Sequence, residues 1–191
     1  MSAGREFSPL VTSETVIGVG YGLQLDAPKD NLRVLATVPQ GTGYVPQGND
    51  PPNIHEVAAL QERARRDHQY TLDLIRRQVQ RAGGSCWFNN NIDLFARVGE
   101  ARFLIEAKSL NDPRAVVDTM RYGMGQLFDY RVRYRAEIEG AAPVLAFGAM
   151  PLPEASWVAG ILQENGVSCV GTAENKLVAL NANAAQLPLY G

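Results

Sequence analysis

Residues 91–108 constrain the fold of this chain most, because they alternate like two strands joined by a short turn. The apolar positions are Ile92, Leu94, Ala96 and Val98 before the turn, and Phe103, Ile105 and Ala107 after it. Such a period of two is typical of half-buried strands. Gly99-Glu100 between them suits a two-residue turn with glycine at its first central position. The segment therefore predicts a β-hairpin.

The register of this hairpin places two carboxylates against each other. If the turn pairs Val98 with Ala101, counting back along both strands sets Asp93 opposite Glu106. Opposed side chains lie roughly 4.5–5.5 Å apart at Cβ, and like charges there are destabilising unless something compensates them. A divalent cation would compensate them, and Lys108 would project from the face of Glu106 at a spacing of about 6.6 Å. These residues are candidates for a metal-dependent catalytic site.

The alternative is that Asp93, Glu106 and Lys108 form a solvated surface with an ordinary ion pair, since exposed pairs contribute little. The neighbours Leu94, Leu104 and Ile105 are apolar, which favours largely buried strands over an exposed edge. Buried carboxylates need partners. The apolar context favours the site.

Composition sets the broad class of the protein. A chain of 191 residues with 46% hydrophobic content fits one globular domain, with residues 1–53 as a β-rich extension and linker and 54–191 as the main domain. The net charge of −2 gives no general polyanion-binding signal, so any contact with nucleic acid must be local. With no apolar run of about 18 residues and no basic leader, we expect a cytoplasmic protein that does not contact membranes.

Both cysteines, Cys86 and Cys169, lack a second ligand at metal-binding spacing. A zinc site and a disulfide framework are therefore not expected, and both residues are predicted to be buried thiols in strands.

The extension contains two predicted strands, 15–22 and 32–38, followed by a Gly/Pro-rich linker at 39–52. Gly18, Gly20 and Gly22 suggest a phosphate-binding loop, but their spacing is not G-x-G-x-x-G and no helix start follows. A hairpin with bulges is the favoured interpretation.

A long helix is predicted from Asn53 to Gly83-Gly84. Its apolar stripe is Val57, Leu60, Ala64, His68, Leu72, Ile75 and Val79. For His68 we favour a core histidine with a satisfied ring, with a site-facing role as the alternative. Glu62 and Asp67 border the stripe, either as metal ligands or as a solvated flank.

A second helix is predicted from Asp112-Pro113 to about Glu137. Gly123 and Gly125 inside it each cost roughly 1 kcal/mol relative to alanine, which implies close backbone approach. Gln126 and Tyr130 share one helix face. The remainder predicts a buried strand at 143–150, a short helix at 153–165 ended by Gly166, and a final strand at 167–170.

Taken together, residues 54–172 resemble the PD-(D/E)XK nuclease superfamily. Asp93 occupies the acidic position, Glu106-Ala107-Lys108 is the E-x-K element, and Gln126 to Tyr130 matches the Q-x-x-x-Y element of the RecB-like branch. Isoleucine replaces the eponymous proline before Asp93. The resemblance implies an α/β (α+β) protein with a restriction-endonuclease-like core, in which helices flank a central mixed β-sheet in the order αβββαβ, here with an N-terminal β-hairpin extension.

The resemblance also implies roles for individual residues. Asp93, Glu106 and the Ala107 backbone carbonyl would hold Mg²⁺, or Mn²⁺ in its place, through oxygen ligands. Lys108 would position the attacking water or stabilise developing charge, and Gln126 and Tyr130 would orient the lysine or the phosphate. A second metal would recruit Glu62 or Asp67.

The implied activity is metal-dependent hydrolysis of DNA phosphodiester bonds by a standalone endonuclease of restriction, phage-defence or repair type. Duplex DNA is the expected partner rather than RNA, with Arg66, Arg121 and Asn91 as candidate contacts and a homodimer as the expected assembly. The alternatives are an exonuclease or RNA-directed relative, and a catalytically silent nucleic-acid-binding module on the same fold.

Overall fold

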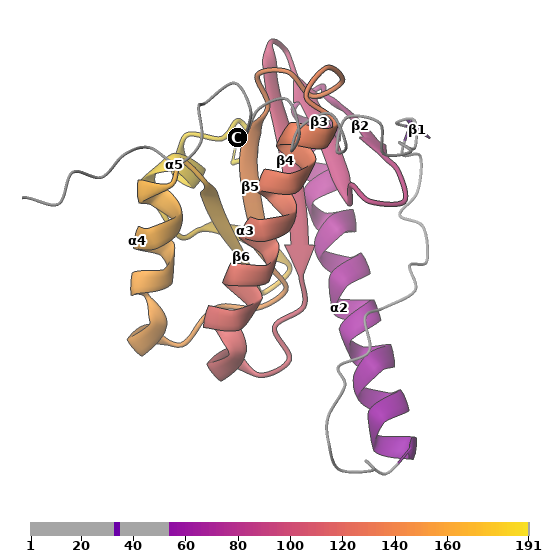
Figure 1. The fold of residues 1–191 in the computed structure, drawn as a ribbon, viewed down its shortest axis with the longest axis vertical. Coiled ribbons are helices and arrows are strands. Elements are labelled where there is room, and N and C mark those ends of the chain that lie inside the picture. The colour runs from indigo at the N-terminus through magenta and orange to yellow at the C-terminus, as the bar shows by residue number, and fades with distance from the viewer. Residues whose placement is uncertain (1–32, 35–53, 191) are drawn as a thin grey trace, which may run out of the picture.

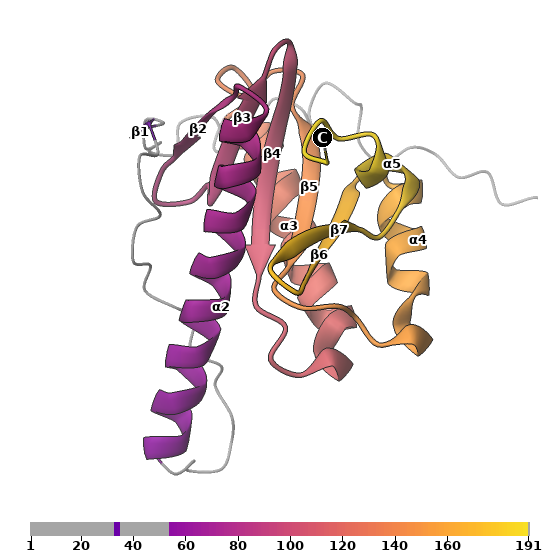
Figure 2. The same ribbon diagram turned by 180° about the vertical axis from the view of Figure 1, so that it is seen from behind.

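A computed structural model describes residues 33–34 and 54–190 of the chain. A mixed seven-stranded sheet lies at its centre, with the strands in sequence order from one edge to the other. Helix α2 lies on one face of the sheet, and helices α3 and α4 lie on the other (Figures 1 and 2). The fold is therefore a three-layer arrangement around one sheet.

The strands are β1 (Arg33–Val34), β2 (Ser85–Phe88), β3 (Leu94–Val98), β4 (Ala101–Lys108), β5 (Ala142–Phe147), β6 (Ser168–Ala173) and β7 (Lys176–Ala179). The α-helices are α2 (Ile54–Arg81), α3 (Val116–Arg133), α4 (Trp157–Glu164) and α5 (Ala182–Ala185). β4 pairs with β5, and β5 with β6, in parallel, whereas the other neighbours are antiparallel. The predicted αβββαβ core, with a mixed sheet flanked by helices, is confirmed by α2, β2, β3, β4, α3 and β5 in that order.

The predicted hairpin is present in the predicted register. Val98 pairs with Ala101 and Leu94 pairs with Ile105 across β3 and β4. Gly99 has a φ of +56°, a conformation that glycine adopts without the steric cost that a side chain would add. The turn residues and the alternation of side chains thus specify one register together.

Each face of the sheet has its own apolar core, and the two faces of β4 belong to different cores. Phe103, Ile105 and Ala107 pack with the buried side of α2. Leu104 packs with α3 and α4. Because side chains alternate along a strand, Glu106 and Lys108 point to the α3 side with Leu104.

Helix α2 packs on the sheet through its second half only. Thr71, Leu72, Ile75 and Val79 are buried, whereas Leu60 is 58% exposed. The predicted apolar stripe is thus buried only in the second half, because the first half of the helix runs past the end of the sheet (Figure 1). Figure 2 shows the same projecting segment from behind.

The boundaries of the second predicted helix differ from the structure. A 3-10 turn at Pro113–Ala115 precedes α3, and Asp112 caps that turn by accepting a hydrogen bond from the Arg114 N–H. The α-helix ends at Arg133, since residues 134–140 form turns before β5. The buried side chains of Tyr134 and Ile138 anchor these turns.

The two glycines of α3 have different reasons to be there. A Cβ at Gly123 would lie 2.5 Å from the Leu145 side chain, so the predicted close approach is confirmed at this position. A Cβ at Gly125 would meet nothing within 4 Å. The prediction was therefore wrong for Gly125, which faces open space.

The C-terminal region continues beyond the strand predicted as final. β6 covers most of the predicted segment, but Glu174 and Asn175, both with positive φ, form a turn into β7. Asn181 then caps α5 by accepting a hydrogen bond from the Ala184 N–H. The short helix before β6 is present as a 3-10 turn at Pro153–Ala155 followed by α4, and Gly166 follows it with a φ of +69°.

Several smaller expectations are settled by the described residues. Cys86 in β2 and Cys169 in β6 are buried and free, as predicted, and burial raises the pKa of each thiol, to about 11 and about 12 respectively. Within residues 33–34 and 54–190, no helix is long and apolar enough to cross a membrane. Of the predicted N-terminal strands, only Arg33–Val34 is described, paired with β2; the strand at 15–22, the glycines within it and the linker lie outside the described residues.

Candidate metal centre and adjoining pocket

Asp93 directly precedes β3. A turn capped by the Asn89 side chain places it near the end of β4. The Asn89 carbonyl oxygen Oδ1 accepts hydrogen bonds from the backbone N–H groups of Asn91 and Ile92, at 2.9 and 2.7 Å. Asp93 Oδ2 accepts the backbone N–H of Ala107 at 3.0 Å. This last bond ties the carboxylate to β4 beside Glu106.

His68 also contacts Asp93. Its Nε2 lies 3.0 Å from Asp93 Oδ2, and both side chains are partly exposed. The favoured interpretation of a core histidine was therefore wrong, and the site-facing alternative agrees with the structure. The physical reason is that His68 lies at the point where α2 leaves the sheet, one turn before the first buried residue, Thr71.

Glu106 is buried to 1% exposure in the interior strand β4. Its Oε1 accepts a hydrogen bond from Lys108 Nζ, and the two groups form an ion pair. Its Oε2 is buried and accepts no hydrogen bond from a described residue, while the Asp93 carboxyl group lies within hydrogen-bonding reach of the Glu106 side chain. Burial, followed by the nearby negative charge of Asp93, raises the pKa of Glu106 to about 8, although Lys108 opposes that shift.

Gln126 and Tyr130 of α3 complete the inner part of the site. Gln126 Nε2 donates a hydrogen bond to the Tyr130 hydroxyl oxygen at 2.9 Å. Gln126 Oε1 is buried without a hydrogen-bond partner in the described part of the chain. Burial, and then the charge of Glu106, raises the pKa of Tyr130 well above its ordinary value, which indicates that its hydroxyl stays protonated close to the carboxylates.

These groups suit a hard divalent cation such as Mg²⁺. The unpaired Glu106 oxygen, the Asp93 carboxylate and the unpaired Gln126 oxygen are all ligand types that such cations prefer. Buried oxygens without partners are costly, and a cation would offset that cost. Among the residues that the structure describes, no three His, Cys, Asp or Glu side chains form a metal-binding group. A cation here would therefore complete its shell with backbone, water or phosphate oxygens, as Mg²⁺ commonly does.

The candidates for a second metal are paired with arginines of α2. Glu62 pairs with Arg65 at 3.5 Å on the exposed part of α2, and Asp67 lies 3.9 Å from Arg63. Both match the alternative of a solvated flank. The role of the Ala107 carbonyl stays a prediction.

The candidate nucleic-acid contacts occupy different surroundings. Arg66 is exposed on the projecting half of α2, and Arg121 is exposed on α3, 3.2 Å from Asp118. Asn91 donates a hydrogen bond from Nδ2 to the buried Tyr134 hydroxyl at 2.6 Å. Their contact with nucleic acid stays a prediction.

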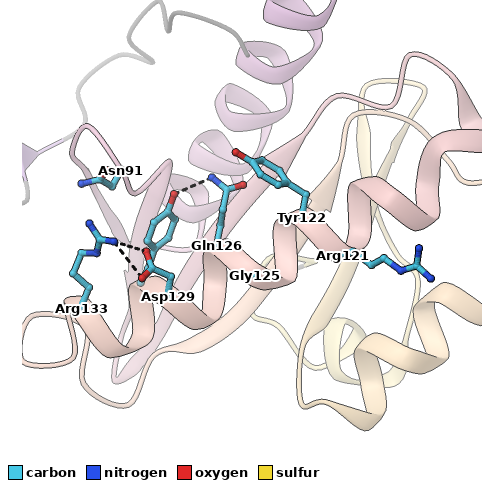
Figure 3. A pocket seen from close by; sticks show the side chains of 8 residues that line it. Asn91, Arg121, Tyr122, Gly125, Gln126, Asp129 and Arg133 are labelled. Atoms are coloured by element: carbon cyan, nitrogen blue, oxygen red, sulfur yellow. Dashed lines mark hydrogen bonds and ion pairs between the residues drawn. The ribbon is translucent and has the colours of Figure 1, made fainter. Parts of the chain in front are cut away.

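A pocket of about 410 Å³ adjoins the candidate metal centre. It is lined by Asn91, Arg121, Tyr122, Gly125, Gln126, Asp129, Tyr130 and Arg133. Figure 3 shows Asn91, Asp129 and Arg133 at one end, Gln126 and Tyr122 in the middle, and Arg121 pointing away from them. Lys108 Nζ lies 4.8 Å from the centroid of the Tyr122 ring, which links the pocket to the Glu106–Lys108 pair.

Three residues of this site were not identified from the sequence. Asn89 shapes the turn before Asp93, Tyr122 joins Lys108 to the pocket, and Tyr134 holds Asn91. A four-residue spacing from Tyr122 through Gln126 and Tyr130 to Tyr134 follows one face of α3 and was a usable signal. The three consecutive asparagines at 89–91 were a signal for an Asx-type turn.

No protein-family model matches the sequence, and no curated protein is detectably similar to it. Among solved structures, the chain is similar to an XisH family protein from Nostoc punctiforme PCC 73102, determined by crystallography at 1.60 Å resolution. The two chains are 14% identical with a TM-score of 0.43, over 57% of this chain and 96% of that chain.

Proposed function

We propose that this chain is a Mg²⁺-dependent nuclease of the PD-(D/E)XK superfamily that hydrolyses phosphodiester bonds in DNA. The observation that carries the proposal is Glu106, a buried carboxylate with one oxygen bonded to Lys108 and the other without a partner among the described residues. The Asp93 carboxylate lies close enough to raise its pKa. A purely structural site would pair such an acid fully, because unpaired buried oxygens are destabilising.

Asp93, Glu106 and the backbone carbonyl of Ala107 would hold the cation. When bound, Mg²⁺ supplies charge stabilisation at the scissile phosphate and lowers the pKa of a bound water. Asp93 is fixed for this task by the Ala107 N–H and by His68, so that its second oxygen, Oδ1, can bind the cation. Partners that orient a ligand in this way typically improve metal affinity.

Lys108 would provide positive charge where the phosphate gains negative charge. Its ammonium group contacts both Glu106 and the ring of Tyr122, which restricts its position. Charge fixed in advance of the reaction stabilises a transition state at little cost in reorganisation. The hydrogen-bonded Gln126 and Tyr130 would orient the phosphate or the lysine from the α3 side.

The test is a cleavage assay on four substrates: supercoiled plasmid, linear duplex, single-stranded DNA and RNA. Each is incubated with Mg²⁺, Mn²⁺ or EDTA, using the wild type, Asp93→Asn and Lys108→Ala. We expect cleavage of DNA that requires the metal and falls by about 10²–10³-fold or more in each variant, the usual loss when a group that stabilises the transition state is removed.

Asp73→Asn is a matched control, because Asp73 is an α2 acid paired with Arg76 and Arg77 away from the site. It should cleave like the wild type. Cleavage that persists in Asp93→Asn would assign the activity to a contaminant or another site. Binding of nucleic acid without cleavage of any substrate would favour the silent binding module, and preferential cleavage of RNA would favour the RNA-directed alternative.

A further inference from the structure

The pocket beside the metal centre has a mixed lining that differs from a simple phosphate-binding surface. It combines the rings of Tyr122 and Tyr130, the amides of Asn91 and Gln126, and three charged groups: Arg121, and the Asp129 carboxylate, which pairs with Arg133 at 3.0 Å. A carboxylate disfavours a phosphate but accepts hydrogen bonds from the amino groups of bases. The lining therefore offers hydrogen-bonding groups for the flat, polar edge of a nucleobase, beside guanidinium groups that suit the neighbouring backbone phosphate.

Tyr122 offers a surface on which a base can stack. The residue is 55% exposed. Its ring also contacts Lys108, the residue assigned to the scissile phosphate. A base stacked on Tyr122 would thus lie within one nucleotide of that phosphate. Stacking on aromatic side chains is how proteins commonly hold unpaired bases.

The dimensions and the backbone of the pocket agree with this ligand. Its volume is about 410 Å³. The pocket is shallow and open to solvent, so it would contact the edge and one face of a base rather than enclose it. Gly125 forms part of the lining, and a side chain added there would meet open space rather than protein. The glycine therefore keeps the pocket open at the helix surface, in the middle of the arrangement drawn in Figure 3.

We propose that this pocket binds one unpaired nucleobase of the substrate strand, stacked on Tyr122, next to the phosphate that a cation at Asp93 and Glu106 would hold. The proposal rests on the proposed nuclease function and specifies its substrate as single-stranded or locally unpaired DNA. A base inside a duplex cannot enter the pocket without being unstacked and unpaired, which weakens its binding. The expected preference is therefore for unpaired strands.

The test measures binding in EDTA, so that cleavage plays no part in it. Fluorescence anisotropy of the full chain is recorded with a labelled single strand of about 12 nucleotides, within the usual site sizes of single-strand binding, with the matching duplex, and with a chain of the same length without bases. The wild type should bind the single strand roughly tenfold or more tightly than the duplex or the abasic chain, which corresponds to the usual contribution of one stacked base.

Variants locate this preference. Tyr122→Ala should bind the single strand and the abasic chain alike, whereas Tyr122→Trp should retain the difference. Gly125→Leu should reduce the difference by filling the pocket without a clash in the fold. Phe128→Ala is the matched control, because Phe128 is an exposed aromatic residue on α3 outside the pocket, and it should behave like the wild type.

Equal affinity for the single strand and the abasic chain in the wild type would overturn the proposal, as would tighter binding of the duplex or no binding at all. Retention of the preference in Tyr122→Ala would also overturn it. The outcome is separable from the nuclease proposal: a base-dependent preference without cleavage would refute the enzyme assignment alone, and metal-dependent cleavage without the preference would refute the pocket assignment alone.

Discussion

The two faces of strand β4 differ in what they bury. The face toward α2 carries Phe103, Ile105 and Ala107 and is entirely apolar along this stretch. The face toward α3 begins in the same way with Leu104 but continues with Glu106 and Lys108. One strand thus supports an ordinary core on one side and carries a buried acid paired with a partly buried lysine on the other.

The difference teaches that the polar face is not there for stability. Replacing a buried ion pair with apolar residues of similar volume is often neutral or stabilising by about 1–4 kcal/mol. The fold tolerates Glu106 beside Asp93 although burial raises its pKa. The proposed function assigns this polar face to metal binding and catalysis, and the following predictions test that division.

The largest expected effect is on the α2 face. Ile105→Ala should reduce the free energy of unfolding by about 2–5 kcal/mol, because it leaves a cavity in a packed core. Urea denaturation followed by circular dichroism measures this change. A loss below about 0.5 kcal/mol, the size typical of surface substitutions, would show that the α2 face is not a packed core.

Apolar substitutions on the other face of β4 are expected not to reduce the free energy of unfolding. Glu106→Met combined with Lys108→Met should keep or increase the free energy of unfolding, by up to about 4 kcal/mol, while removing metal-dependent cleavage. The reason is that the desolvation cost of the pair disappears and apolar contacts with α3 replace it. A clear decrease in the free energy of unfolding, measured in the same denaturation experiment, would mean that the pair stabilises the fold.

The acidity of Glu106 predicts how stability depends on pH without metal. Its folded pKa of about 8 exceeds its ordinary value of 4.5, so the folded state holds the proton more tightly than the unfolded state. This contribution to stability is complete below pH 4.5 and is lost as pH rises toward 8. The limiting slope of that loss is roughly 1.4 kcal/mol per pH unit.

Denaturation in EDTA at pH values from about 5 to 8 measures that loss, and Mg²⁺ should reduce it because metal binding favours the ionised carboxylate. Glu106→Gln serves as the control and should remove this component of the pH dependence. A variant with the same pH profile as the wild type would assign the effect to another group.

The smallest expected effect concerns the contact between His68 of α2 and Asp93. His68→Ala should weaken Mn²⁺ binding by about 10–100-fold, because His68 orients Asp93. The unfolding free energy should change little, since the ring is partly exposed. His68→Gln, which can still donate a hydrogen bond, should recover part of the affinity; an unchanged affinity in His68→Ala would remove His68 from the site.

The hairpin could be predicted from the sequence because its determinants are local. Alternation of apolar residues and the Gly99-Glu100 turn together admit one register, which places Asp93 beside the strand that carries Glu106. The helix face shared by Gln126 and Tyr130 follows from their spacing alone. These parts of the candidate site needed no knowledge of how distant elements pack.

Other parts of the fold and of the candidate site could not be predicted, because they depend on where helices and strands end relative to one another. Helical periodicity assigned His68 to a buried stripe, but it does not encode that α2 runs past the sheet. The pocket forms between α3 and the turn before β3, and Gly125 has a role only once that space exists. β7 was missed because Glu174-Asn175 is a less distinctive turn sequence than Asn-Gly.

The most direct test of the central claim is calorimetric titration of the full chain with Mn²⁺ near neutral pH, comparing the wild type with Glu106→Gln, Asp93→Asn and the control Asp73→Asn. If Asp93 and Glu106 hold a catalytic cation, the wild type and the control will bind Mn²⁺ alike, and both site variants will lose affinity by about tenfold or more. Equal Mn²⁺ binding by all four proteins would contradict the account.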